Sequence, residues 1–456
     1  MMKWVSCPCW GTNDDENSGE TAADRDPVLL VSGMGGSILH SKKKNSKSEI
    51  RVWVRLFLAN LAFRQNLWSL YNPKTGYTEP LDEDIEISVP EDDHGLYAID
   101  ILDPSWFVKL CHLTEVYHFH DMIEMLVGCG YKKGTTLFGY GYDFRQSNRI
   151  DQLMLGLKKK LETAYKTSGE RKVTIISHSM GGVMISCFMF LYPEVFSKYV
   201  GKWITIATPF QGLLQILSLG KLFIATFTGN DIGFGLTGAP GCINDSLLTG
   251  VQFVEGLESF FFVSRWTMHQ LLVECPSIYE MMANPYFKWK KQPEIRVWRK
   301  KTEKDNDETS AELETFGLVE SIDLFNDALK NNELSYGGNK IALPFNFSIL
   351  EWASKTREIL NKAKLPDGVS FYNIYGVAQD TPFDPEYTYV DGDGTVPAES
   401  AAAAQFKSVA SVGVSGTHRG LLHDKRVFEL IQQWLGVEPK KAKRKHSRTH
   451  KVADSG

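Results

Sequence analysis

The stretch Val173-Thr-Ile-Ile-Ser-His-Ser-Met-Gly-Gly182 decides the fold of this chain. Its β-branched run, Val173 to Ile176, predicts a strand, and the apolar run from Val183 to Leu191 predicts a helix directly after it. The residues between them are small enough for the sharp turn of a G-x-S-x-G elbow, although Ser177 stands where the first glycine would be. Such a turn exposes the side chain at its apex, so Ser179 is the candidate nucleophile. The alternative is an ordinary serine in a glycine-rich turn of another α/β protein.

Strands and helices alternate before and after this unit. The predicted strands are 28–31, 135–142, 203–207, 371–376 and 409–414, and the predicted helices are 121–127 and 150–164. This alternation predicts the α/β class with a mostly parallel sheet, here in an α/β-hydrolase fold. The long irregular region before the strand at 371–376 is rich in aromatic residues. It predicts a large cap or lid inserted over the edge of the sheet.

We predict five segments from the changes in pattern along the chain. They are a flexible N-terminal segment, 1–25; a first part of the hydrolase core, 26–209, with an excursion at about 40–105; the cap or lid, 210–365; a second part of the core, 366–437; and a disordered basic tail, 438–456. The lysines and arginines of the tail fit an anionic membrane surface, a nuclear address or a merely solvated end.

The composition of the chain limits its possible functions and the cellular compartment in which we expect it. The chain has 456 residues and a net charge of -5, which does not suggest general affinity for nucleic acid. Its 7 cysteines are scattered and lack metal-ligand spacing, so we expect a reducing compartment rather than a disulfide framework. No apolar segment near the N-terminus is long enough for a signal peptide, so secretion is not expected. Cys7 and Cys9 are either acylation sites or free thiols.

A glycine-rich loop, Ser32-Gly-Met-Gly-Gly-Ser37, follows the first predicted strand. A dinucleotide fingerprint would need a glycine or alanine where Ile38 stands and an acidic residue at the right distance in a second strand, and both are missing. We therefore expect the loop to turn backbone N–H groups toward the nucleophile. An oxyanion needs two such donors, and we assign them to Met34 and to Met180, the residue after Ser179.

A serine hydroxyl becomes a nucleophile when a histidine takes its proton and a carboxylate orients that histidine. In this fold the three groups follow the chain order Ser, Asp or Glu, His. His418 follows the last predicted strand and a short loop, whereas the later histidines lie near the final helix or in the basic tail, so His418 is the predicted base. Asp391 and Asp393 share one tight turn between Ser179 and His418. We choose Asp393 as the acid, with Asp391 as the alternative.

Residues 51–68 are apolar with interspersed arginines and tryptophans. This pattern is typical either of a segment at the lipid headgroup boundary or of a buried core helix. Trp53, Leu56 and Phe57 are the side chains that we would assign to a membrane contact. The region from Leu213 to Phe227 is also apolar, but Lys221 in its middle does not support a membrane span.

Two polar stretches have residue types found in functional sites but are better explained as structural. His118-Phe-His-Asp121 has residue types that bind metals, but it more readily opens the helix that follows, so no metal site is predicted. Asp143 and Arg145 stand at the end of a predicted strand. Such a near-adjacent pair is more often a structural ion pair than a pair of catalytic groups.

Together these motifs resemble the family of lecithin:cholesterol acyltransferase and lysosomal phospholipase A2, and most of all its plant phospholipase A1 branch. The shared residues are Val31 to Gly36, Tyr142 to Arg145, His178 to Gly181, Asp391 to Val396 and His418, over most of residues 27–436. The resemblance implies a hydrolase with a cap and a small lipid-binding subdomain, the excursion at about 40–105. It also implies attack on phospholipid acyl esters by Ser179, Asp393 and His418 without calcium or another cofactor.

The chain departs from this family in several places. No cysteine stands between Cys9 and Cys111, so the disulfide that closes the lipid-binding loop of secreted relatives has no counterpart. Met34 stands where relatives can carry an acidic residue, which is expected to alter acid dependence. Residues 213–238 look like an insertion, and the join at 384–386 looks shortened relative to the plant relatives.

The expected function is that of a phospholipase A1, which hydrolyses the sn-1 ester of phosphatidylcholine-like glycerophospholipids through an acyl-enzyme. The alternatives are acyl transfer to a sterol or diacylglycerol, and a non-catalytic lipid or ligand sensor on a hydrolase scaffold. The expected partners are the phospholipid substrate and a membrane surface bound peripherally, not nucleic acid, and no oligomeric state is predicted. We expect the chain on the cytoplasmic face of microsomal or endoplasmic reticulum membranes or in the cytosol.

Overall fold

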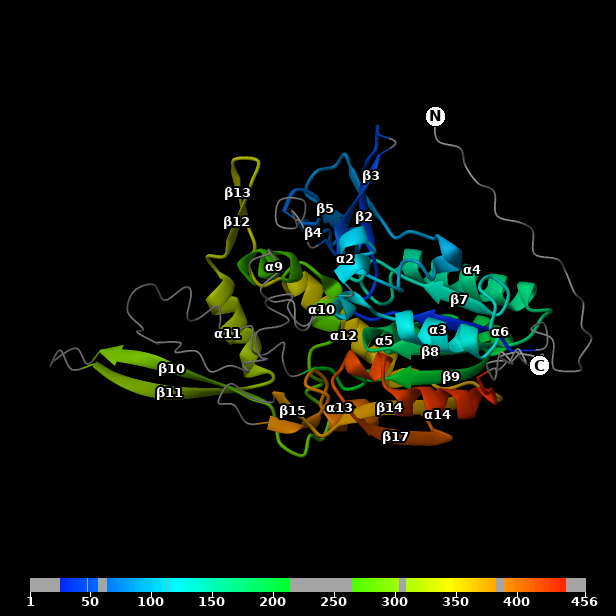
Figure 1. Cartoon of the computed structure of the whole chain (residues 1–456). Helices are drawn as coiled ribbons and strands as arrows, with labels where there is room; N and C mark the ends of the chain where they lie inside the picture. Colours follow the sequence, from blue (N-terminus) through cyan, green and yellow to red (C-terminus); the bar gives the residue numbers. More distant parts are fainter. Residues whose placement is uncertain are drawn as a thin grey trace, which may run out of the picture.

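A parallel sheet lies at the centre of the molecule. The computed structural model describes residues 25–46, 48–55, 64–111, 113–213, 265–302, 309–382 and 389–439. The main sheet has six strands in the order β17-β14-β9-β8-β1-β7 (Figure 1), and each of its pairings is parallel. Its strands are β1 (Val28–Val31), β7 (Leu137–Tyr140), β8 (Val173–His178), β9 (Val200–Ile206), β14 (Ser370–Val377) and β17 (Ala410–Ser415). The predicted α/β-hydrolase type of fold is confirmed.

Helices cover both faces of this sheet. On one face lie α4 (Asp151–Thr167), α5 (Met180–Leu191) and α6 (Pro193–Tyr199), which pack on strand residues such as Leu29 and Ile175. On the other face lie α3 (His120–Gly128) and α14 (Lys425–Leu435), which pack on Val28 and Ile176. Successive side chains of a strand point to opposite faces, and here both faces are buried. This is why β8 is buried at every residue and carries the β-branched run Val173–Ile176 instead of alternating between buried and exposed residues.

The excursion at 40–105 forms two small antiparallel sheets, which Figure 1 places above the main sheet. One consists of β2 (Leu39–Lys43), β3 (Glu49–Trp53) and β6 (Ile85–Ser88), and the other of β4 (Ser69–Tyr71) and β5 (Thr78–Pro80). The short helices η2 (Asp93–Gly95), α2 (Trp106–Cys111) and η3 (Thr114–Val116) follow. The alternative of a core helix over 51–68 is wrong for residues 51–53, which form the end of β3. Leu56 and Phe57 lie outside the described residues.

The region predicted as the cap mixes helices and hairpins. Its described elements are α9 (Arg265–Leu272), α10 (Pro276–Glu280), the hairpin β10 (Glu294–Thr302) and β11 (Thr309–Gly317), α11 (Glu320–Leu329), the hairpin β12 (Glu333–Tyr336) and β13 (Asn339–Ala342), and α12 (Phe347–Lys362). Leu360 of α12 packs against Val183 and Cys187 of α5, so this region ends on the helix that follows the elbow. Most of the expected insertion at 213–238 and the join at 384–386 lie outside the described residues.

Short elements complete the second part of the core. The strand β15 (Gln379–Pro382) pairs with β16 (Tyr389–Gly392), and the helices α13 (Ala398–Ala402) and η7 (Gly420–Leu422) follow.

In the described part of the chain, no single helix is long and apolar enough to cross a membrane. One bent pair, α5 with α6, passes that test only when the two are taken together, and it bends by 110°.

A buried carboxylate joins the cap region to the core. Glu280 of α10 accepts hydrogen bonds from the Ser147 hydroxyl at 2.5 Å, from the backbone and side-chain N–H groups of Asn148 at 2.8 Å each, and from the Thr356 hydroxyl at 2.8 Å. Burial raises the pKa of this carboxyl, and the hydrogen bonds to Ser147, Asn148 and Thr356 oppose that rise. A carboxylate is stable away from water only with such donors. Glu280 therefore connects α10, α12 and the loop between β7 and α4.

Replacing Glu280 with alanine should lower the free energy of unfolding by about 3 kcal/mol or more, because several buried donors lose their acceptor at once. Chemical denaturation followed by tryptophan fluorescence measures this change. Glu351→Ala, on the exposed side of α12 where Glu351 pairs with Lys355, is the matched control and should leave the midpoint unchanged. Equal midpoints for the two variants would show that Glu280 does not hold these elements together.

Candidate active site

The backbone turns sharply at Ser179, between the last residue of β8 and the first residue of α5. Ser179 has φ 54° and ψ -129°, a conformation that L-residues rarely adopt. Its N–H donates to the Ile206 carbonyl at 2.9 Å, which ties the turn to the neighbouring strand β9. The side chain is 7% exposed, whereas the flanking Ser177 is fully buried. The predicted strand, sharp turn and helix are therefore present, with Ser179 at the apex.

Close backbone packing explains the small residues around this turn. A Cβ on Gly181 would lie 2.4 Å from the Ser32 carbonyl oxygen, and one on Gly182 would lie 2.1 Å from the Thr208 hydroxyl. A Cβ on Gly33 would lie 2.7 Å from the Cβ of Ser179 itself. Ser177, which replaces the usual glycine, accepts a hydrogen bond from the Trp203 indole at 2.9 Å. The serine at this position is thus held by a partner of its own.

The structure brings Ser179, His418 and Asp393 together from three parts of the chain. The Ser179 hydroxyl lies 2.9 Å from Nε2 of His418, and Nδ1 of His418 lies 2.8 Å from Oδ2 of Asp393. A carboxylate can only accept, so Nδ1 carries the proton and Nε2 is left to accept the serine proton. His418 follows β17 on a loop, and its backbone N–H also donates to the Asp393 carbonyl at 2.8 Å.

The neighbouring Asp391 is oriented differently. Asp393 is 1% exposed, and its Oδ1 accepts from the N–H groups of Thr395 at 2.9 Å and Val396 at 2.6 Å, which leaves Oδ2 for His418. Asp391 lies on β16, is exposed, and accepts from the Ala378 N–H at 2.5 Å instead. Of the two carboxylates on this turn, the one chosen from the sequence is the one that meets the histidine.

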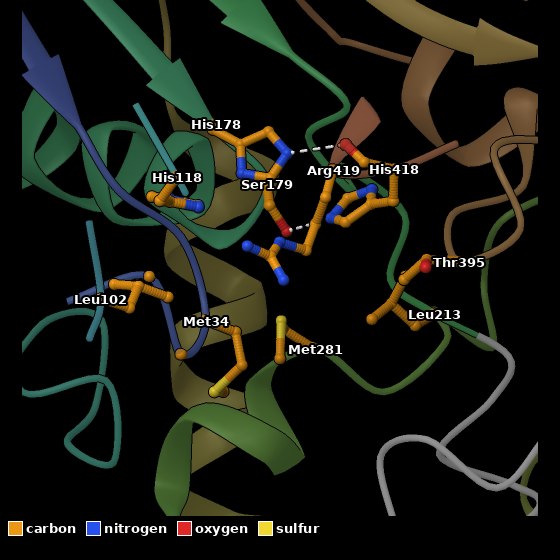
Figure 2. Close-up of a pocket in the computed structure, with 12 residues that line it drawn as sticks. Met34, Leu102, His118, His178, Ser179, Leu213, Met281, Thr395, His418 and Arg419 are labelled. Carbon is orange, nitrogen blue, oxygen red and sulfur yellow. Dashed lines mark hydrogen bonds between the residues drawn. The ribbon is translucent and has the colours of Figure 1, made fainter. Parts of the chain in front are cut away.

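The glycine-rich loop after β1 lies beside Ser179, as expected for a loop that offers backbone donors. Met34 lines the pocket at Ser179 (Figure 2). Met180 begins α5, where backbone N–H groups have no acceptor within the helix. The loop is held by a hydrogen bond between the hydroxyls of Ser32 and Ser37 at 2.7 Å. Met34 and Met180 thus both lie close to Ser179, and their role as oxyanion donors stays a prediction.

Trp53 supports this loop and does not reach a membrane. Its side chain is 1% exposed, its indole N–H donates to the Gly35 carbonyl at 2.8 Å, and its ring packs against Phe144 with centroids 5.3 Å apart. The assignment of Trp53 to a membrane contact is therefore corrected. An interspersed tryptophan has the same sequence pattern in a core as at an interface, because its amphipathic ring suits both.

A pocket of about 530 Å³, which includes space open to solvent, lies over Ser179. Figure 2 shows its lining. Most of the exposed surface of the wall is apolar, with Met34, Leu102, Leu213 and Met281 among its side chains, and the polar side chains are Ser179, Thr395, three histidines and Arg419. An apolar pocket with a few polar groups around a nucleophile suits a substrate with a long hydrocarbon portion.

Two histidines beside the triad stay neutral. Burial lowers the pKa of His178 well below its ordinary value, and the nearby His418 lowers it further. Burial, followed by the neighbouring His178, does the same to the pKa of His118. Nε2 of His178 donates to the His418 carbonyl at 3.0 Å, since a carbonyl can only accept. His178 therefore holds the backbone of the catalytic histidine candidate without adding a charge next to it.

The polar stretches predicted to be structural have separate partners. His118 lies under Gly36, His120 bonds Asp100 at 2.7 Å, and Asp121 bonds His423 at 3.0 Å. Within the described ranges, no group of three or more His, Cys, Asp or Glu side chains is placed to hold a metal ion.

The predicted ion pair of Asp143 and Arg145 is confirmed. Nη2 of Arg145 lies 2.7 Å from Oδ2 of Asp143, and the buried guanidinium also donates to the Leu67 carbonyl at 2.9 Å and the Ser69 hydroxyl at 2.6 Å. This pair fixes the small sheet of β4 and β5 to the core rather than taking part in the site.

The sequence did not predict that His118, His178 and Arg419 line the pocket at Ser179. His178 and Arg419 had one available signal, since each is adjacent in sequence to a predicted catalytic residue. His118 had none, because it reaches the pocket from a segment far from every motif of the site.

These features define an α/β-hydrolase: a parallel sheet, a sharp turn at Ser179 and a loop after β17 that carries His418. Ser179 is the candidate nucleophile, and it lies under an apolar pocket. Comparison with known proteins gives the family. Residues 51–222 match the family model described as lecithin:cholesterol acyltransferase. The chain is 80% identical, over an alignment of 475 positions, to "Phospholipase A(1) LCAT3" of Arabidopsis thaliana, and the alignment covers 100% of both chains. This chain therefore belongs to the lecithin:cholesterol acyltransferase family, and the resemblance stated from its motifs is confirmed.

Two further relatives show how far the similarity extends. The chain is 47% identical to "Lecithin-cholesterol acyltransferase-like 4" of Arabidopsis thaliana over 90% of this chain and 75% of that protein. It is 27% identical to the human "Lysosomal phospholipase A and acyltransferase" over 42% of this chain and 48% of that protein. Similarity within the family thus ranges from the full length to less than half of it.

Proposed function

We propose that this chain is a phospholipase A1 that hydrolyses the sn-1 acyl ester of glycerophospholipids. The observation that carries the proposal is the contact of the Ser179 hydroxyl with His418, and of His418 with Asp393, at 2.9 and 2.8 Å under an apolar pocket. The sn-1 position is supported by the name of the Arabidopsis relative that is 80% identical. A phosphatidylcholine labelled on the sn-1 chain tests it, since the label must appear in the free fatty acid and not in the lysophospholipid.

The geometry supports an acyl-enzyme mechanism. Oγ of Ser179 attacks the carbonyl carbon while Nε2 of His418 takes the hydroxyl proton, and the Asp393 carboxylate stabilises the resulting imidazolium. The N–H groups of Met34 and Met180 stabilise the oxyanion. The bond to the glycerol oxygen breaks, that oxygen takes the proton from His418, and the lysophospholipid leaves. Water then attacks the acyl-enzyme with His418 as base, and the fatty acid and free Ser179 result.

We propose that this reaction does not depend on calcium. In the mechanism above, backbone N–H groups polarise the ester carbonyl and His418 accepts and returns the proton. Groups of this chain therefore carry out every step that a calcium ion would otherwise assist. The expected result is equal rates of phosphatidylcholine hydrolysis in a chelator and in added calcium. A rate that disappears in the chelator and returns with calcium would contradict the proposal.

The acceptor of the acyl group separates hydrolysis from acyl transfer. The human relative is named both a phospholipase A and an acyltransferase, so the labelled substrate is to be incubated with and without sterol and diacylglycerol. Free fatty acid in both cases supports the proposal, and labelled sterol ester or triacylglycerol supports the transferase. A fluorophosphonate probe separates both from a lipid sensor, because a blocked or inactive Ser179 would stay unlabelled.

We further propose that the chain binds membranes peripherally, on the cytoplasmic face of microsomal or endoplasmic reticulum membranes or from the cytosol. With Trp53 buried, the exposed apolar side chains of α2 support this contact better. Trp106 is 74% exposed and Leu110 66% exposed, one helical turn apart, with Lys109 exposed beside them. Tryptophan, leucine and lysine on one short surface are typical of a helix at the headgroup boundary.

Trp106→Ala should weaken binding to phosphatidylcholine vesicles about 10-fold, because the membrane would no longer bury an indole. Vesicle co-sedimentation at several lipid concentrations measures this. Leu155→Ala removes an exposed leucine from α4 and is the control. Hydrolysis of a water-soluble ester should be unchanged in both variants. If the two variants bind vesicles equally well, α2 is not the contact.

A further inference from the structure

His118 is a buried polar side chain in the wall of the pocket at Ser179. It is 3% exposed, and neither of its ring nitrogens has a hydrogen-bond partner among the described residues. A buried N–H group without an acceptor destabilises the folded state, so such a group in a native protein calls for an explanation. No step of the proposed mechanism uses this ring. A donor in a binding pocket is explained when a ligand supplies its acceptor.

The ring of His118 has one N–H group and no charge. Burial lowers the pKa of His118 well below its ordinary value, and the neighbouring His178 lowers it further. A neutral imidazole has one N–H donor and one acceptor nitrogen. His178 does not take this donor, because the two rings meet edge to face with centroids 5.5 Å apart and Nδ1 of His178 has no partner in the described ranges either. The N–H of His118 is therefore available to an oxygen in the pocket.

One turn of the glycine-rich loop connects this ring to the nucleophile. The N–H of Gly36 donates to the Gly33 carbonyl at 3.2 Å, which closes a turn around Met34 and brings its two ends close together. At one end, a Cβ on Gly33 would lie 2.7 Å from the Cβ of Ser179. At the other end, a Cβ on Gly36 would lie 2.4 Å from Nε2 of His118. Ser179 and Nε2 of His118 thus contact the two ends of the same turn.

Figure 2 shows the Ser179 side chain between the rings of His118 and His418. The side of His418 is the one where the proton moves and where the leaving oxygen lies, because the same imidazole protonates that oxygen. The carbonyl oxygen turns away from the catalytic histidine, toward the backbone donors expected at the glycine-rich loop. The ring of His118 lies on this second side, next to that loop.

We propose that Nε2 of His118 donates a hydrogen bond to the oxyanion that forms when Ser179 attacks the ester, as a third donor beside two backbone N–H groups. In this step Oγ of Ser179 bonds to the carbonyl carbon, the C=O electron pair moves to the oxygen, and the hydroxyl proton goes to His418. A hydrogen bond to a charged oxygen is stronger than one to a neutral carbonyl, so this donor stabilises the transition state more than the bound ester. This inference rests on the proposed function, because it concerns the reaction of the same site.

The test uses two side chains of equal length at position 118. Glutamine has an amide that can donate from about the position of Nε2, whereas methionine has no donor. His118→Met should lower kcat for phosphatidylcholine hydrolysis about 100-fold with KM unchanged, the effect of losing one oxyanion donor. His118→Gln should recover most of that rate. His40→Met, which removes a histidine paired with Glu49 outside the pocket, is the matched control and should keep the wild-type kcat.

A second measurement distinguishes the oxyanion contact from a disturbed fold. An alkyl trifluoromethyl ketone adds to a serine nucleophile and forms a tetrahedral oxyanion, whereas a dialkyl ether analogue of phosphatidylcholine has no carbonyl group. Both are used as inhibitors of p-nitrophenyl butyrate hydrolysis by wild type and by the two variants of His118. His118→Met should weaken inhibition by the ketone about 100-fold and leave inhibition by the ether unchanged.

Three results would overturn the inference. Equal weakening of both inhibitors would indicate a general effect on the pocket, and a raised KM at unchanged kcat would place the contact of His118 on the bound ester. Equal rates of His118→Gln and His118→Met would show that the donor has no role. Wild type that hydrolyses p-nitrophenyl butyrate but not phosphatidylcholine would refute the proposed function instead, and the ketone comparison would still decide on His118.

Discussion

Replacing Ser179 with alanine should lower kcat for phosphatidylcholine hydrolysis by about 10⁶-fold and abolish labelling by a fluorophosphonate probe. The expected loss is this large because Oγ of Ser179 is the atom that carries the acyl group, and His418 lies 2.9 Å from it. His418→Ala should cost about as much, and the double variant should be no worse than either, since the two residues act as one unit. Product release measured over hours with titrated enzyme is sensitive enough for these rates.

A matched control for Ser179 lies on α5, the helix that follows it. Ser186 of α5 is buried, and its hydroxyl donates to the Gly182 carbonyl at 2.9 Å within the same helix, so Ser186→Ala should keep both activity and probe labelling. If Ser179→Ala retained as much as about a hundredth of the wild-type rate, the triad could not be the source of catalysis. Activity would then have to come from another nucleophile.

Asp393→Asn should lower kcat by about 10⁴-fold while leaving the fold intact. The asparagine oxygen can still accept from the N–H groups of Thr395 and Val396, as Oδ1 of Asp393 does now. Its amide nitrogen would then face Nδ1 of His418 as a donor. The histidine would respond by carrying its proton on Nε2, where it could no longer accept the proton of Ser179.

Asp391→Asn is the control for this experiment, because Asp391 lies on the same turn but bonds the Ala378 N–H. Its rate should stay close to that of wild type. Circular dichroism and the denaturation midpoint establish that both variants are folded. The reverse outcome, with Asp391→Asn inactive and Asp393→Asn active, would exchange the roles of the two carboxylates.

The contacts of two buried side chains, Trp53 and Glu280, could not be predicted from the residues next to them in the sequence. Trp53 was assigned to a membrane, yet it holds Gly35 beside the nucleophile, because an isolated tryptophan does not say what it packs against. Glu280 attracts no notice in the sequence, although its buried carboxylate links the cap region to the loop before α4. The partners of Glu280 on that loop, Ser147 and Asn148, are 133 and 132 residues away in sequence.

The sequence alone determined the sheet, the elbow at Ser179 and the membership of the family, because each rests on a short-range pattern. A β-branched run, a turn of small residues and an apolar helix impose their local conformation wherever the chain leads afterwards. Only the tertiary structure placed the Asp393 carboxylate against His418, buried Trp53 and placed Arg419 in the pocket. These outcomes depend on how segments far apart in sequence pack together, such as Ser179 and His418, which are 239 residues apart. Periodicity and spacing do not encode that packing directly.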